Sequence, residues 1–113
     1  MNLAFAVERL LETGWSAAGE SDLDHLPDGR PFPTLAGIRR VFERAGLKLE
    51  LKMNFMFSCC RATWAPKGET VDPDHAEDER HGTVVGSCEK EAAVYALAQW
   101  RAAAVHDHSL VGA

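Results

Sequence analysis

Seven consecutive residues alternate between apolar and charged side chains without exception. Residues 47–53 read Leu-Lys-Leu-Glu-Leu-Lys-Met. Side chains of a strand point to opposite faces with a period of two, so this stretch predicts a strand with one wet face and one buried face. A sheet half covered in this way needs further strands beside it and helices on its apolar face.

A helix is predicted directly before this strand. Thr34 follows Pro33 and is a suitable N-cap, and Gly46 is a suitable stop. Between them the apolar residues recur at helical spacing. The predicted apolar face consists of Leu35, Ile38, Val41, Phe42 and Ala45.

Two further strands are expected after it. Asn54 and its neighbours can turn the chain, and residues 56–64 (MFSCCRATW) are typical of a second strand. Phe55 and Phe57 blur the alternation at its start, which indicates a bulge or burial on both faces. A third, short strand is expected at 83–85, after an acidic loop at 66–82.

Helices are expected at both ends of the chain. The first covers residues 3–13, with Leu3, Val7, Leu10 and Leu11 on one stripe, and a connecting loop follows at 16–33 with a Pro-Asp-Gly turn at 27–29. The last begins after Gly86 with Ser87 as N-cap and runs to about Ala104. It leaves a frayed tail at 105–113.

These elements form one α+β domain over residues 1–113, with the order α-α-β-β-β-α and a three-stranded antiparallel meander packed against helices. A chain of 113 residues is near the commonest domain size. Residues 1–33 add an N-terminal helix and loop to a core at 34–104.

The core resembles the double-stranded RNA-binding domain. The resemblance lies in the order helix, strand, strand, strand, helix and in the string Gly-Ser-Cys-Glu-Lys-Glu-Ala-Ala at 86–93. It implies that fold, but not the RNA site. Lys90 stands between two glutamates that would repel phosphate, and residues 52–56 (KMNFM) replace the longer Gly-Pro-x-His loop of the family.

Charge is distributed in three blocks. Residues 1–29 carry one base and six acids, residues 30–67 eight bases and two acids, and residues 68–113 three bases and nine acids, within a net charge of −5. The basic block indicates either a face for a polyanion or attraction among the three segments, and we favour the latter. The candidate nucleic-acid-binding residues are Arg39, Arg40, Arg44, Lys48, Lys52 and Arg61.

No pattern specifies a metal or cofactor site. The five histidines and three cysteines lack the usual ligand pairs, and Cys59 and Cys60 should point to opposite faces of a strand. The acidic run around His75 lacks the spacing of a calcium loop. No catalytic set is assigned, although Cys88 at a helix N-terminus is a candidate reactive thiol.

The function expected is that of a non-enzymatic binding or interaction domain, with a protein partner favoured over nucleic acid. Double-stranded RNA binding by the basic face and a thiol enzyme or redox protein centred on Cys88 are the alternatives, and homo-oligomers stay open. No apolar stretch approaches the roughly 20 residues of a membrane span. The odd number of cysteines favours a cytoplasmic setting, and eight arginines against four lysines suggest a bacterial source.

Overall fold

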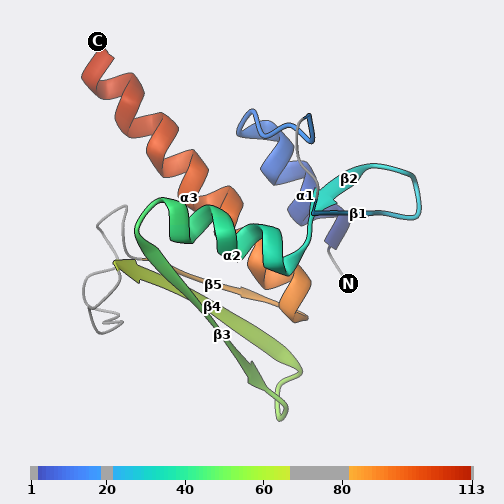
Figure 1. The fold of residues 1–113 in the computed structure, drawn as a ribbon. Helices are drawn as coiled ribbons and strands as arrows, with labels where there is room; N and C mark the ends of the chain where they lie inside the picture. The colour runs from blue at the N-terminus through green and yellow to red at the C-terminus, as the bar shows by residue number, and fades with distance from the viewer. Residues whose placement is uncertain (1–2, 19–21, 67–81, 113) are drawn as a thin grey trace.

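The computed structural model describes residues 3–18, 22–66 and 82–112, with side chains described up to residue 103. It confirms a mixed α+β fold, and the described residues form three helices and two antiparallel sheets (Figure 1). The elements in chain order are α1 (Leu3–Glu12), β1 (Leu23–His25), β2 (Pro31–Pro33), α2 (Leu35–Arg44), β3 (Leu47–Asn54), β4 (Cys59–Pro66), β5 (Gly82–Gly86) and α3 (Glu89–Gly112).

Helix α2 forms where its caps predict it. The Thr34 hydroxyl accepts a hydrogen bond from the Gly37 N–H at 3.2 Å and satisfies one of the free donors of the first turn. Gly46 has φ +78°, a conformation that ends the helix and suits glycine. Ile38 and Phe42 are buried, whereas Ala45 is exposed at the C-cap.

The predicted meander is confirmed, with β4 in the centre of the order β3-β4-β5. Leu49 lies opposite Trp64, and Lys52 lies opposite Arg61. Leu47 and Leu49 are buried while Lys48, Glu50 and Lys52 are exposed, so the alternation separates an inner face from an outer one. Helices α2 and α3 pack on the inner face (Figure 1).

The predicted start of the second strand is wrong. Residues 55–58 form a turn and β4 begins at Cys59. The Asn54 side chain accepts hydrogen bonds from the Met56 N–H at 3.1 Å and the Phe57 N–H at 3.3 Å. These local bonds outcompete strand pairing, and Phe55 and Phe57 are exposed rather than buried on two faces.

The predicted loop at 16–33 contains a second hairpin. Strands β1 and β2 pair antiparallel, with Asp24 opposite Phe32. The predicted Pro-Asp-Gly turn closes this hairpin, where the Gly29 N–H donates to the Leu26 carbonyl at 2.8 Å. Strands of three residues are too short to show a periodic pattern.

Both ends of the last helix differ from the prediction. Cys88, not Ser87, takes the N-cap position, because its carbonyl accepts from the Ala92 N–H at 3.0 Å. The Ser87 hydroxyl instead donates to the Glu91 carboxylate. The helix continues to Gly112 rather than ending near Ala104, since neither glycine nor proline interrupts residues 87–111.

The core joins all the helices to the inner face of the sheet. The Phe42 ring lies 5.8 Å from the Trp64 ring and 5.4 Å from the Trp100 ring, measured between centroids. Helix α1 packs along α3 through Val7 and Leu10. The prediction that Leu11 belongs to this buried stripe is wrong, because Leu11 is 38% exposed.

None of the helices in the described residues is long and apolar enough to cross a lipid bilayer.

Candidate interaction surface

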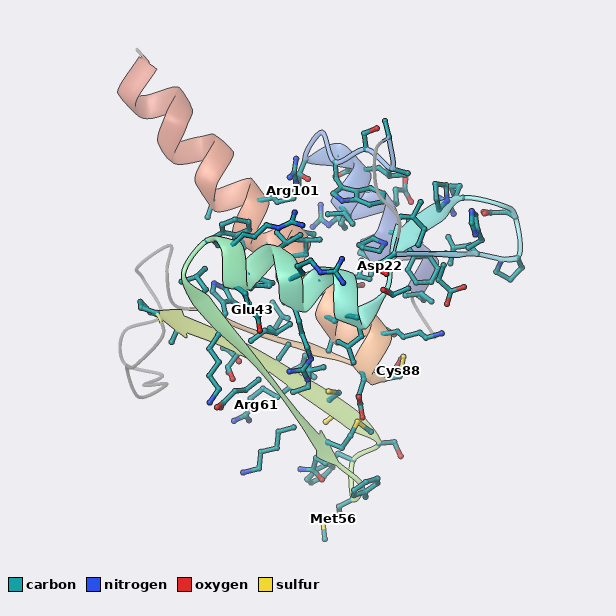
Figure 2. All side chains as sticks on the ribbon, in the orientation of Figure 1. Asp22, Glu43, Met56, Arg61, Cys88 and Arg101 are labelled. Carbon is teal, nitrogen blue, oxygen red and sulfur yellow. The ribbon has the colours of Figure 1, made fainter. Side chains whose placement is uncertain are left out.

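The six candidate basic residues lie on two separate parts of the surface. Arg39, Arg40 and Arg44 are exposed on α2. The other three are exposed on the outer face of the three-stranded sheet, from β3 and β4; Figure 2 labels Arg61 on β4. These are Lys48, Lys52 and Arg61.

Among the described residues, two of the three arginines of α2 have partners. Arg40 forms an ion pair with Asp22, which joins the basic block to the first acidic block. The Arg39 guanidinium donates to the Leu49 carbonyl at 3.4 Å, at the free edge of β3. These contacts occupy groups that would otherwise face a ligand.

Lys90, the lysine of the string at 86–93, is also paired. Its ammonium lies 3.1 Å from the Asp24 carboxylate of the β1–β2 hairpin. The His25 backbone N–H, and after it the Lys90 side chain, hold the pKa of Asp24 below its usual value. Asp22, just before β1, and Asp24 within it therefore both face cations of other elements.

Lys52 and Arg61 present two like charges side by side. They are directly opposite each other on β3 and β4, with Val85 of β5 in the next position across the sheet. Lys48 has Glu50 at 3.1 Å, but neither Lys52 nor Arg61 has an ion pair with a described residue. Like charges in opposite positions destabilise a strand pair.

The β3–β4 turn carries the most exposed apolar side chains of the described chain. Phe55 and Met56 are each 85% exposed and Phe57 is 73% exposed. Figure 2 shows Met56 at the end of the hairpin, pointing away from the body of the molecule. We call Phe55, Met56 and Phe57 the apolar tip.

The tip is an ordered turn. The Asn54 side chain binds two consecutive backbone N–H groups, and Ser58 has φ +49°, in the left-handed region. Sequence reasoning missed the tip because it assigned Met56 and Phe57 to a strand. Asn54 was recognised as a turn residue, but the apolar residues from Met56 onward were assigned to the strand.

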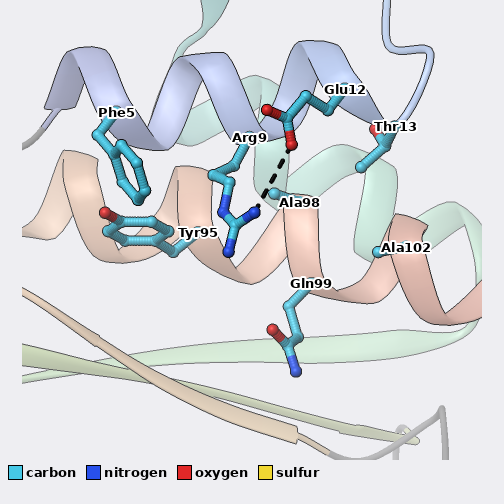
Figure 3. A pocket seen from close by; sticks show the side chains of 8 residues that line it. All are labelled: Phe5, Arg9, Glu12, Thr13, Tyr95, Ala98, Gln99 and Ala102. Atoms are coloured by element: carbon cyan, nitrogen blue, oxygen red, sulfur yellow. Dashed lines mark ion pairs between the residues drawn. The ribbon is translucent and has the colours of Figure 1, made fainter.

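A groove between α1 and α3, lined by both apolar and polar side chains, is a further feature of the surface (Figure 3). It has a volume of about 660 Å³. The Phe5 and Tyr95 rings meet edge to face at 6.3 Å, and the Arg9 guanidinium lies 5.5 Å from the centre of the Phe5 ring. The lining residues are Phe5, Arg9, Glu12, Thr13, Tyr95, Ala98, Gln99 and Ala102.

Two polar contacts shape the groove. Arg9 pairs with Glu12 at 3.6 Å along α1. At one end the Arg101 Nε donates to the Thr13 hydroxyl at 3.0 Å and ties α3 to α1.

Burial raises the pKa of the Tyr95 phenol, with the Glu91 charge as a second cause. Sequence reasoning missed this groove, because it exists only once α1 packs on α3.

The structure also places the three cysteines. Cys59 is half-buried and Cys60 is buried, on opposite faces as predicted, and all three cysteines are free. Burial, and then the charge of Glu89, raises the pKa of the Cys60 thiol. Among residues 3–18, 22–66 and 82–103, no cluster of three or more histidine, cysteine, aspartate or glutamate side chains is arranged so that it could hold a metal ion. The acidic run around His75 lies outside the described residues.

Comparisons with protein-family models, with curated proteins and with solved structures gave no match. The resemblance to the double-stranded RNA-binding domain therefore stays a prediction that rests on the order of elements and the string at 86–93.

Proposed function

We propose that this chain is a non-enzymatic interaction domain that binds a protein partner through the apolar tip. The proposal rests on one observation: the Phe55, Met56 and Phe57 side chains are 85, 85 and 73% exposed at the end of one hairpin. Single exposed apolar residues are ordinary on protein surfaces, but a contiguous group of large ones marks an interaction site.

The energetics of burial support this assignment. Removing a Phe or Met side chain from water contributes roughly 1.5–3 kcal/mol. Large side chains of this kind act as anchors when they enter a pocket on a partner, and a few of them carry most of the binding free energy of an interface.

The order of the turn supports it as well. Association loses affinity when loops must be immobilised. The Asn54 side chain already fixes the backbone of Met56 and Phe57, so less conformational entropy is lost when the tip binds.

Site-specific photo-crosslinking in cells of the source organism tests the proposal. A benzophenone amino acid replaces Met56 in one variant and Asp28, at the exposed turn of the other hairpin, in a matched control. We expect a discrete protein adduct at position 56 that disappears when Phe55 and Phe57 are also changed to Ser. No adduct at position 56, or equal adducts at both positions, would contradict the proposal.

A second candidate function is binding of double-stranded RNA. The observation that favours it is the pair Lys52 and Arg61, side by side on the uncovered sheet face with no acidic partner among the described residues. Titration of a labelled RNA duplex of about 16 base pairs tests it, because phosphate contacts predict a steep loss of affinity with salt. Lys52→Glu with Arg61→Glu should abolish such binding, and no binding at low salt would rule it out.

The remaining predictions from sequence concern chemistry and setting. A thiol enzyme centred on Cys88 would require a thiol that reacts faster than those of Cys59 and Cys60, which alkylation followed by mass spectrometry measures. Three free cysteines in the fold support our proposal of a reducing, cytoplasmic setting. A bacterial source is a prediction from composition alone.

A further inference from the structure

Two cations lie beside the apolar tip. Lys52 and Arg61 are opposite each other on the outer face of the β3–β4 hairpin, two rungs of the ladder, or about 7 Å, from the pair next to the turn. Figure 2 labels Arg61 on the same hairpin that ends at Met56. The apolar tip and the two cations are therefore neighbouring parts of one exposed surface.

The fold does not neutralise these two charges within the described chain. Lys48, the third cation of this face, pairs with Glu50 at 3.1 Å, whereas Lys52 and Arg61 pair with no described residue. Like charges in opposite positions destabilise a strand pair. Because the described contacts gain nothing from this arrangement, it indicates an anion outside the fold.

The tip alone is smaller than a usual interface. Three side chains of this size bury roughly 500 Å², and a standard interface buries about 800 Å² on each partner. A protein that covers the tip therefore also covers surface beside it. Helices α2 and α3 pack on the inner face of the sheet, so the outer face, which carries Lys52 and Arg61, is the open one (Figure 1).

We infer that the partner of the tip is a different protein with an acidic surface, which takes the tip into an apolar pocket and pairs carboxylates beside that pocket with Lys52 and Arg61. This inference rests on the proposed function, since it names the chemistry of the partner. Opposite residues of two strands have Cβ atoms about 5 Å apart, so one carboxylate placed between these two side chains can accept hydrogen bonds from both.

The number of cations favours the carboxylates of a protein over a polyanion or a lipid surface. Proteins that hold a nucleic-acid backbone make about 6–10 phosphate contacts, and segments that bind anionic lipids carry about 4–8 lysines and arginines. Beside the tip, the described outer face has two cations without an ion pair, Lys52 and Arg61. Two cations suit one or two discrete carboxylates.

The α1–α3 groove of a second copy does not have the required chemistry. Arg9 and Glu12 offset each other in its lining, and Arg101 adds a cation at one end. This groove therefore offers no excess of acid to Lys52 and Arg61, and we assign the tip to a different protein.

Crosslinking from two matched positions tests which face the partner covers. A benzophenone amino acid replaces Val85, which is opposite Arg61 on the outer face and 57% exposed. Phe5, 51% exposed on α1, is the control. In cells of the source organism we expect the Val85 position to give an adduct of the same mass as the Met56 position, and the Phe5 position to give none.

A charge reversal tests the acidity of the partner. Arg61→Glu places a carboxylate opposite Lys52 and removes the repulsion across the strand pair, so the melting temperature should be unchanged or higher. The yield of the Met56 and Val85 adducts should nevertheless fall about 10-fold or more, the effect of losing one charge-assisted hydrogen bond, and Arg61→Lys should keep most of it. Arg44→Glu, at an exposed arginine of α2 without an ion pair in the described chain, is the matched control and should leave both yields unchanged.

Two further probes test the other classes of partner. Vesicles of phosphatidylcholine with phosphatidylserine and an RNA duplex of about 16 base pairs are titrated with the purified chain. Binding of either probe that is lost in the variant with Phe55→Ser and Phe57→Ser would overturn the inference. An adduct of twice the 12.4 kDa monomer mass would overturn it as well, because it identifies a second copy.

The outcomes separate this inference from the proposed function. A Met56 adduct that survives Arg61→Glu, or a Val85 position that gives no adduct or the same yield as Phe5, rejects the acidic partner and leaves the tip as the interaction site. No adduct at Met56 rejects both.

Discussion

The turns of the two hairpins in the described chain share their backbone hydrogen bonding but differ in the side chains that they expose. In the β1–β2 turn the Asp28 carboxylate accepts from the Arg30 N–H at 3.0 Å, and in the β3–β4 turn the Asn54 amide oxygen accepts from the Met56 N–H at 3.1 Å. Each turn also contains one residue with positive φ, Gly29 at +92° and Ser58 at +49°. The exposed residues are polar or small in the first turn and large and apolar in the second.

The difference separates what a turn needs from what a surface is used for. A side-chain acceptor and a residue tolerant of positive φ are sufficient to reverse the chain, as residues 27–29 show. Nothing in the β3–β4 turn geometry requires Phe55, Met56 or Phe57, because none of them is buried against the fold. Their apolar character has no role within the fold, which is the reason we propose that they contact a partner.

The largest effect is expected from making the β3–β4 turn surface polar, like that of the β1–β2 turn. Changing Phe55 and Phe57 to Ser, with the benzophenone amino acid at position 56, should reduce tip-dependent crosslinking about 30-fold, the effect of losing about 2 kcal/mol of anchor contacts. The melting temperature should stay the same, since the three side chains stabilise no folded contact. Crosslinking yield and thermal unfolding measure the two outcomes; a large drop in melting temperature would mean that the tip supports the fold.

The positive-φ residues should respond in opposite directions. Gly29→Ala puts a side chain on a left-handed backbone and should cost about 1–2 kcal/mol, although a Cβ there meets no atom within 4 Å. Ser58→Gly relieves the same strain and should gain about 0.5 kcal/mol after the entropy cost of glycine. Denaturant unfolding measures both. Equal effects of the same sign would show that the two turns are not built alike.

Removing the side-chain acceptors should loosen each turn separately. Asn54→Ala should cost about 1 kcal/mol through its two lost bonds and speed amide exchange at Met56 and Phe57. Asp28→Ala should speed amide exchange only at Arg30, the residue whose N–H the Asp28 carboxylate binds. Hydrogen exchange by NMR compares the amides. Unchanged exchange at residues 56 and 57 would mean that the tip is not held by Asn54.

The smallest effect concerns pH. The Arg30 backbone N–H, and after it the Arg30 side chain, lower the pKa of Asp28 from its usual 3.8. A lowered folded pKa adds stability above the unfolded pKa that is lost as pH falls through the folded one. Below about pH 4 the β1–β2 turn should therefore weaken, while the β3–β4 turn, which Asn54 holds without a titrating group, should not. Amide shifts of Gly29 and Phe57 against pH test this, and parallel changes would contradict it.

Local patterns predicted the regular elements well. The alternation of Leu47 to Met53 and the caps at Thr34 and Gly46 place β3 and α2 correctly, because each depends on neighbours in sequence. The turn at Phe55 was misplaced because the β propensity of the apolar residues competed with the local hydrogen bonds of Asn54, and sequence alone does not show which is stronger.

The surface features depend on packing and were harder to predict. The basic residues were identified, but the pairing of Arg40 with Asp22 and of Lys90 with Asp24 depends on where the β1–β2 hairpin docks. The groove requires Phe5 and Tyr95, which are 90 residues apart, to meet across two helices. Such contacts are set by tertiary structure and leave no local signal.

Photo-crosslinking at Met56, with Asp28 as the matched position on the other turn, tests the central claim most directly. We predict a discrete protein adduct at Met56, none at Asp28, and loss of the adduct when Phe55 and Phe57 become Ser. If the Met56 adduct persists after these changes, or if neither turn gives an adduct, the apolar tip is not the interaction site of this protein.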